Sequence, residues 1–155
     1  KKINVNDEFI KEELNRFHVS LLKNYNFSDD LWNLVNSYEV EKINIADIQL
    51  GHFIEETETI YYVGVFESVD RIVIEKVSKY VKILNAESEI ELFLCGINSD
   101  SFLRALLVMA EYFITCMIHV EQYNNAEYRE SMCKKCIELA GGMEFREFYE
   151  YIFII

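Results

Sequence analysis

The sequence predicts an α+β fold with N-terminal helices, a central antiparallel sheet of about five to six strands, and C-terminal helices packed on it. Two observations predict these elements: apolar residues recur at helical spacing at both ends of the chain, whereas residues 43–95 form short runs of β-branched and aromatic residues. The turns between these runs are too short for crossover helices, which favours antiparallel pairing. An order of helices, sheet and helices is typical of α+β proteins.

Length and composition indicate one domain. The 155 residues are a common domain size, and no linker, repeat or low-complexity tract divides them, so we expect a single domain over 1–155. Hydrophobic residues make up 51% of the chain, which is enough for a large core. No apolar run approaches the length of a membrane span and no signal segment stands at the start. We therefore expect a cytoplasmic protein without a membrane-spanning helix.

The N-terminal region predicts two helices. The first covers residues 6–24, where Asn6 or Asp7 can cap the helix. Its apolar stripe consists of Phe9, Ile10, Leu14, Phe17, Leu21 and Leu22. The second is short, follows Ser28–Asp30, and carries Trp32, the only tryptophan, which we expect to anchor the core.

The middle of the chain predicts the sheet. In the first strand region, Ile43, Ile45, Ile48 and Leu50 precede Gly51, and Phe53 and Ile54 follow it. The later strands cover 59–66, 71–75, 80–84 and 89–95. Polar turns are predicted at 55–58 and 67–70. Gly64 lies inside a strand, which indicates a bulge or a close approach of another backbone.

The C-terminal part predicts three helices. A buried strand ends at Gly96, and residues 98–101 supply oxygens that can cap a long helix from about 99 to 122. A helix follows over 126–140 and ends at two glycines. The last helix covers 143–153.

Charge is the strongest functional signal. The net charge is −12, with −7 in residues 39–75 and −5 in residues 87–121. Direct nucleic-acid binding is disfavoured, because neutralising phosphates requires Lys and Arg. An acidic surface attracts basic proteins and speeds their docking. Plain solubility is the alternative explanation.

No catalytic or metal-binding motif stands out. Cys133 and Cys136 have the spacing of a redox or zinc pair, but they fall inside a predicted helix and no second ligand pair accompanies them. We expect packing roles and reduced thiols for all four cysteines. The histidines, His18, His52 and His119, are isolated. We expect no catalytic residues, metal or cofactor.

The acids Glu55, Glu56 and Glu58 between two predicted strands are open to three interpretations. Carboxylates this close can hold a metal or transfer protons. In a hairpin turn they more commonly form a solvated tip. Beside a cleft, they can also receive Lys and Arg side chains of a partner. Of the neighbouring Tyr61 and Tyr62, one must face the core because strand residues alternate between faces.

Several short motifs match a known family. The segments are Leu50–Gly51, Ile60–Gly64, Arg71–Ile74, Tyr80–Val81 and Ile97–Leu106, the last containing Asn-Ser-Asp-Ser-Phe before the long helix. This layout, over residues 48–112, resembles the SUKH superfamily of bacterial immunity proteins, and most nearly the fourth family within it.

The resemblance implies an α+β protein without catalysis that binds and neutralises a cognate toxin, commonly a nuclease or a nucleic-acid deaminase. A nuclease tends to carry a basic groove for phosphates, which an acidic protein can fill. We expect the toxin-binding surface to include Glu55, Glu56, Glu58, Glu67 and Asp70, with Tyr61 or Tyr62 as an aromatic anchor. The alternatives are a non-catalytic adaptor or assembly module, and an enzyme that uses acidic side chains in a deep pocket.

Overall fold

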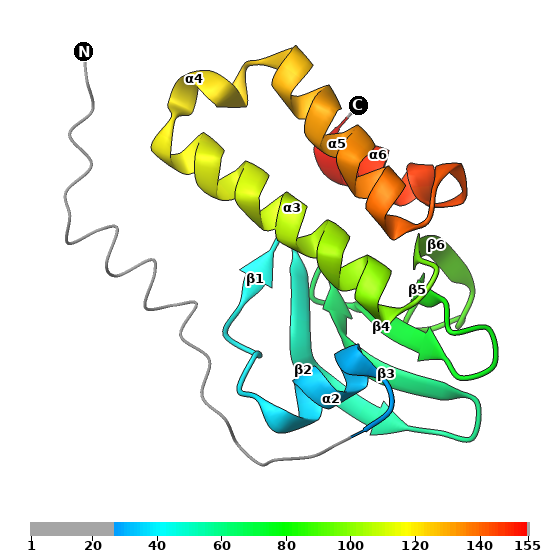
Figure 1. The fold of residues 1–155 in the computed structure, drawn as a ribbon. Helices are drawn as coiled ribbons and strands as arrows, with labels where there is room; N and C mark the ends of the chain where they lie inside the picture. Colours follow the sequence, from blue (N-terminus) through cyan, green and yellow to red (C-terminus); the bar gives the residue numbers. More distant parts are fainter. Residues whose placement is uncertain (1–26, 155) are drawn as a thin grey trace.

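The computed structural model describes residues 27–154, so the helix predicted over 6–24 lies outside the described residues. The described chain forms a helix, an antiparallel six-stranded sheet and further helices packed against it, which confirms the predicted fold class (Figure 1). The helices are α2 (Asp30–Ser37), α3 (Ser99–Ile118), α4 (Val120–Tyr123), α5 (Ala126–Ala140) and α6 (Arg146–Phe153), with a 3-10 turn η1 (Met143–Phe145) before α6.

The sheet is a meander in which each strand pairs with the next one in sequence. Its strands are β1 (Asn44–Ile45), β2 (Ile48–Glu56), β3 (Ile60–Phe66), β4 (Asp70–Glu75), β5 (Val81–Leu84) and β6 (Glu91–Gly96). All five pairings are antiparallel, as the short turns predict. Alternate turns of a meander therefore lie at the same end of the sheet.

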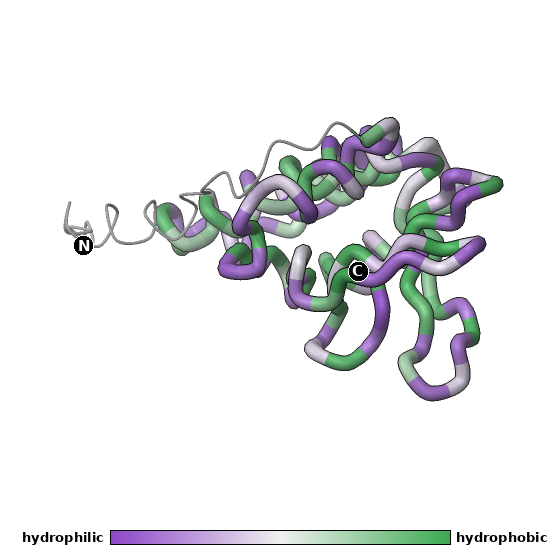
Figure 2. The backbone as a smooth tube through the Cα atoms, turned by 90° about the horizontal axis from the view of Figure 1, so that it is seen from below, coloured by the Kyte–Doolittle hydropathy of each residue, from purple (hydrophilic) through white to green (hydrophobic). Residues whose placement is uncertain are grey.

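The helices cover one face of the sheet and bury the main core against it (Figure 1). Side chains of this inner face alternate with outward ones along each strand, as Ile72 and Ile74 do on either side of Val73. Figure 2 shows hydrophobic and hydrophilic positions interspersed along the helices, as expected for helices that bury one side. The hydroxyl of Tyr149 in α6 donates a hydrogen bond of 2.6 Å to the Cys95 carbonyl, which fixes α6 to β6.

Side-chain caps start the helices where the sequence predicts them. Asn98 accepts a hydrogen bond from the Ser101 amide and begins α3. Asp29 accepts one from the Trp32 amide at 3.0 Å and begins α2. The same Asp29 oxygen accepts a 2.7 Å hydrogen bond from the Ser99 hydroxyl. The start of α2 is thus joined directly to the start of α3.

The long helix is shorter than predicted. It ends at Ile118, and a break at His119 separates it from α4, so the prediction of one helix to about 122 was wrong. β-branched side chains are crowded here, at Ile114, Thr115, Ile118 and Val120, and they lower helix propensity. α5 ends at Gly141 as predicted, and the last helix is divided into η1 and α6.

α3 is rich in apolar residues. By length and hydropathy it could cross a membrane, and it is the one such helix among the described residues. The core helix of a soluble protein passes the same test, and one face of α3 is buried against the sheet and α5. This arrangement is consistent with a soluble protein.

Candidate protein-binding surface

The β2–β3 hairpin places the three neighbouring acids differently from the prediction. Glu55 and Glu56 belong to β2, where they pair with Tyr62 and Tyr61, so the prediction of a turn over 55–58 was wrong. The turn begins later because Thr57 closes it: the Thr57 amide donates to the Ile60 carbonyl, and the Thr57 hydroxyl accepts from the Ile60 amide.

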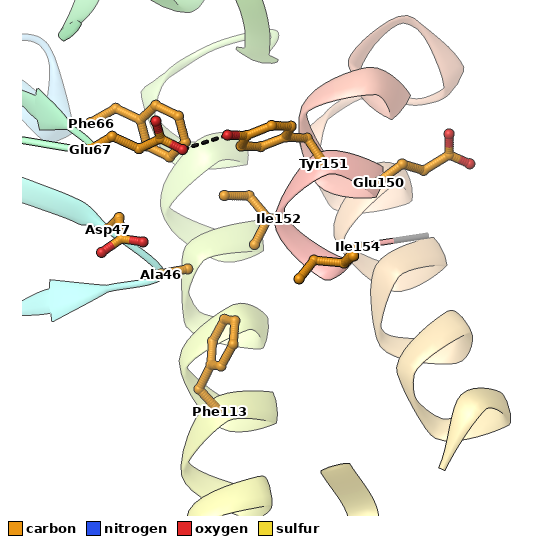
Figure 3. Close-up of a pocket in the computed structure, with 9 residues that line it drawn as sticks. All are labelled: Ala46, Asp47, Phe66, Glu67, Phe113, Glu150, Tyr151, Ile152 and Ile154. Carbon is orange, nitrogen blue, oxygen red and sulfur yellow. Dashed lines mark hydrogen bonds between the residues drawn. The ribbon is translucent and has the colours of Figure 1, made fainter. Parts of the chain in front are cut away.

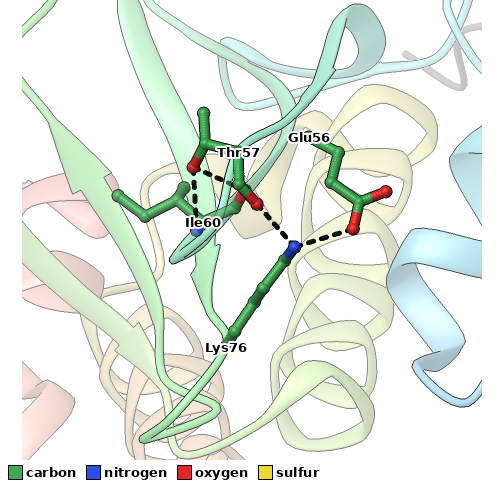
Figure 4. A network of polar contacts seen from close by, with 4 residues as sticks. All are labelled: Glu56, Thr57, Ile60 and Lys76. Carbon is green, nitrogen blue, oxygen red and sulfur yellow. Dashed lines mark hydrogen bonds and ion pairs between the residues drawn. The ribbon is translucent and has the colours of Figure 1, made fainter.

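Glu56 takes part in a network of polar contacts with Lys76 and Thr57 (Figure 4), and Lys76 also contacts Tyr61. The Lys76 ammonium contacts the Glu56 carboxylate at 2.7 Å, donates to the Thr57 carbonyl at 2.5 Å, and lies 4.4 Å from the Tyr61 ring centroid. Tyr61 in turn stacks on Trp32, with ring centroids 4.5 Å apart. Tyr61 is therefore the tyrosine that faces the core, and Trp32 is the buried anchor that the sequence predicts.

Tyr62 lies on the outer face of the sheet, in a hollow of about 220 Å³. Its ring meets Phe53 edge-on at 5.6 Å, and the Arg71 guanidinium lies over the same Phe53 ring at 4.2 Å. Burial raises the pKa of Tyr62, with further contributions from Glu89 and Glu55, so its hydroxyl stays a neutral hydrogen-bond donor at neutral pH. Glu55 lines this hollow with an exposed carboxylate.

The remaining predicted site residues stand at two turns. Glu58 is exposed at the tip of the β2–β3 hairpin, and within residues 27–154 its carboxylate has neither an ion pair nor a hydrogen bond. Asp70 begins β4, where it accepts hydrogen bonds from the Asn85 amide group and from the backbone N–H of Ala86. Asp70 therefore fixes the β5–β6 loop, whereas Glu58 is free to meet a partner.

Glu67 lies at the larger hollow, a pocket of about 650 Å³ between two turns of the sheet and α6 (Figure 3). It accepts a hydrogen bond of 2.5 Å from the Tyr151 hydroxyl. Asp47, in the β1–β2 turn, stands beside it, and the Glu67 amide donates to the Asp47 carbonyl at 3.0 Å. The walls are largely apolar and include Phe66, Phe113, Ile152 and Ile154.

Both turns at this pocket use left-handed backbone conformations without glycine. Ala46 and Asp47 have φ of 49° and 63°, and Glu67 and Ser68 have φ of 49° and 63°. Such conformations cost roughly 1–2 kcal/mol per residue for L-amino acids, although Asp tolerates them better. They make a two-residue turn between β1 and β2 and a three-residue turn between β3 and β4. The two turns set Asp47 and Glu67 side by side at one rim.

Asp47, Glu150 and Tyr151 were not among the predicted site residues. The sequence did hold a signal for Asp47, because the first and third turns of a meander must lie at the same end of the sheet. It held none for Tyr151, because the packing of α6 against β3 and β6 brings it there. Glu150 lines the pocket but points away from Glu67 and pairs with Arg146 at 2.6 Å (Figure 3).

Most cations of the described chain are neutralised by nearby acids. Ion pairs join Lys42 to Glu39, Lys76 to Glu56, Lys82 to Glu75 and Glu91, Arg104 to Asp100, Lys135 to Glu111 and Arg146 to Glu150. Residues 27–154 hold 10 Lys and Arg against 23 Asp and Glu, a net charge of −13. The excess carboxylates, among them Asp47, Glu55 and Glu58, therefore give the surface its uncompensated negative charge.

The cysteine pair lies in the middle of α5, as predicted. Burial raises the pKa of the Cys133 thiol to about 11 and that of the Cys136 thiol to about 12, so both are protonated at neutral pH and weak nucleophiles. Within the described part of the chain, no three His, Cys, Asp or Glu side chains come together in a group that could hold a metal ion.

Comparisons of this chain with protein-family models, with curated proteins and with solved structures found no match.

Proposed function

We propose that this chain is a non-enzymatic immunity protein that binds and neutralises a toxin domain with a basic, nucleic-acid-binding groove. The toxin would be a nuclease or a nucleic-acid deaminase, and the two proteins would meet in the cytoplasm. The observation that carries the proposal is the pocket beside Asp47 and Glu67, which combines apolar walls with uncompensated negative charge. The resemblance of residues 48–112 to SUKH immunity proteins supports the same class.

The chemistry of the pocket suits a basic partner. A Lys or Arg side chain has an apolar stem and a charged head. The stem can pack on Phe66, Phe113 and Ile152, while the head meets Asp47 and Glu67 at the rim. Pairs of this kind across an interface speed association and select the partner, because like charges repel the wrong one.

The proposal includes a second contact region at the β2–β3 hairpin, whose tip lies at the opposite end of the sheet from the pocket. Glu55 and Glu58 present exposed carboxylates and contact the toxin directly. Tyr61 and Glu56 contribute indirectly, because they hold the hairpin in place through Trp32 and Lys76 respectively. Asp70 contributes by fixing the β5–β6 loop beside the outer hollow. Tyr62, at the surface of that hollow, is the aromatic residue best placed to meet a partner.

The proposed function is tested by co-expressing the chain with the toxin domain encoded next to its gene and scoring growth. The wild-type chain should restore growth, and the purified proteins should form a complex that leaves the toxin inactive. Growth arrest despite soluble expression of both proteins would refute the immunity function. An adaptor or assembly module of the same fold, the alternative, would bind a non-toxic partner and leave growth arrested.

The pocket is tested by Asp47→Asn combined with Glu67→Gln. Both substitutions remove charge and keep shape, and Asn is well tolerated at left-handed φ, so the turns should persist. A hydrogen bond to a charged group is worth about 1.5–3 kcal/mol, so toxin affinity should fall at least about tenfold. The dependence of affinity on salt should become shallower, because fewer charges meet. Isothermal titration at several salt concentrations measures both quantities.

The matched control is Glu138→Gln combined with Glu147→Gln, which removes two exposed charges from α5 and α6. Its affinity should stay within about twofold of wild type, because these acids lie outside the two hollows and surface charge alone contributes little. Equal losses in the two double variants would mean that net charge, rather than this pocket, attracts the toxin.

The hairpin is tested by Glu55→Lys combined with Glu58→Lys. Glu56 is left intact, because its pair with Lys76 supports the hairpin. Charge reversal places two cations opposite a basic groove, so growth rescue should weaken and the salt dependence of binding should flatten. Unchanged inhibition by this variant would remove the hairpin from the binding surface while leaving the pocket in it.

A further inference from the structure

α3 carries a second apolar stripe on the side away from the core. Its buried residues are Ser99, Phe102, Ala105, Leu106, Val108, Met109, Tyr112 and Cys116. The second stripe, Leu103, Leu107, Ala110 and Ile114, recurs at spacings of four, three and four residues, and Met117 and Ile118 continue it. Leu103, at the edge of this stripe, is partly buried and also packs against the core. Leu107 is 69% exposed and Met117 is 53% exposed. Exposed apolar patches of this kind mark surfaces that another element covers.

The position where the described chain begins indicates what covers the stripe. The Asp29 carboxylate accepts a hydrogen bond from Ser99 in the first turn of α3, so the described chain begins close to the N-terminus of α3. A 19-residue helix over 6–24 would be about 28 Å long, and the 20 residues of α3 span about 30 Å. A segment running back from this point along α3 matches its length.

The same segment carries the complementary pattern. Ile10, Leu14, Phe17 and Leu21 recur at spacings of four, three and four residues, as the α3 stripe does. Two helices with such seams pack against each other by inserting the side chains of one between those of the other. Charge also favours the contact, because residues 1–26 hold five Lys and Arg against four acids, a net +1, whereas residues 27–154 carry −13.

We propose that residues 6–24 dock antiparallel along the outer stripe of α3, with Leu21 beside Leu103, Phe17 beside Leu107, Leu14 beside Ala110 and Ile10 beside Ile114. The small side chain of Ala110 leaves room for Leu14. Docking would turn the exposed apolar stripe of α3 into a buried helix–helix interface. This inference does not depend on the proposed immunity function.

The experiment is hydrogen–deuterium exchange of the full chain, comparing wild type with Leu107→Lys combined with Ile114→Lys. In wild type, amides of residues 9–22 should exchange at least about tenfold more slowly than in the double variant. Both substituted side chains are exposed in the described structure, so the sheet should stay protected in both proteins. The control is Val69→Lys combined with Val77→Lys, two exposed valines in turns of the sheet, which should leave protection of residues 9–22 unchanged.

A cysteine pair tests the register. In Phe17→Cys combined with Leu107→Cys, the two thiols should form an intramolecular disulfide under mild oxidation by oxidised glutathione. In Phe17→Cys combined with Leu103→Cys, the two cysteine positions are offset by about one helical turn, so this pair should oxidise at least about tenfold more slowly. The four native thiols are buried, which keeps them out of the reaction.

Three results would overturn the proposal. The first is rapid exchange of residues 9–22 in the wild-type chain, or protection that survives the lysine substitutions. The second is a molecular mass, measured by light scattering, of twice that of one chain, together with protection of the α3 amides from exchange that rises with protein concentration. A second copy of the chain would then cover α3. The third is sedimentation of the chain with phosphatidylglycerol vesicles that the lysine substitutions abolish, since a membrane would then be the occupant.

Discussion

Gly64→Ala is expected to lower the free energy of unfolding by about 3 kcal/mol. A Cβ at position 64 would lie 2.3 Å from the Gln49 carbonyl oxygen and 3.0 Å from the Leu50 Cα, both backbone atoms of the neighbouring strand. The backbone of β2 cannot yield easily here, because Leu50 pairs directly with Gly64 and is buried. Strand propensity alone predicts the opposite sign, since alanine is less costly than glycine inside a strand.

Urea unfolding followed by circular dichroism measures this loss. Gly142→Ala is the matched control: a Cβ there would meet nothing within 4 Å, but its φ of 114° disfavours an L-residue. That variant should lose only about 1 kcal/mol, from backbone strain. A Gly64→Ala protein as stable as wild type would show that β2 and β3 do not approach this closely.

Phe148→Ala is expected to cost about 4 kcal/mol, the largest single effect we predict. The Phe148 side chain is fully buried, and its ring contacts Phe66 in β3, Phe93 in β6 and Tyr149 beside it. Removing the ring leaves a cavity between α6 and the sheet, which the surrounding strands cannot fill by collapsing. The lost packing is that of α6, the helix that also places Tyr151 at the pocket.

If the m-value of urea unfolding is unchanged, the shift in the unfolding midpoint measures this loss of stability. Phe148→Leu keeps most of the volume and should cost about 1 kcal/mol. Val77→Ala, at a position 89% exposed, should change stability by less than about 0.5 kcal/mol. If Phe148→Ala costs no more than Phe148→Leu, α6 is not packed on β3 and β6 as described.

The two glycines of β2 and β3 mark irregular backbone in both strands. The sequence places apolar residues on both sides of Gly51, and in the structure β2 runs through Gly51 to Glu56. Gly51 has a φ of 78° and opens an irregular stretch in which pairing with β3 moves from Leu50 to Glu55. The bulge predicted at Gly64 is confirmed by the shift of pairing with β4 between Tyr62 and Gly64. A glycine therefore marked irregular backbone correctly, but not whether the strand stops.

Some features of the predicted site follow from nearby residues in the sequence, and others depend on contacts that only the structure shows. Local spacing was enough to predict acids near the β2–β3 hairpin, and alternation was enough to predict that one of Tyr61 and Tyr62 faces inward. Only the structure assigns Tyr61 to Trp32 and Glu56 to Lys76, because both partners lie at least 20 positions away in sequence. An acid counted from the sequence as free can thus be neutralised by a distant cation.

The sequence by itself determined the fold class, the order of the elements, the segments 28–30 and 98–101 that hold the helix caps, and the excess of negative charge. Each of these follows from residues close together in the chain, through helical or strand periodicity and through local hydrogen bonds. Only the tertiary structure decided that Asp47 and Glu67 share the rim of one pocket with Tyr151, and that α3 presents a second apolar face to the outside. Both depend on contacts between segments far apart in sequence, which periodicity and composition do not encode.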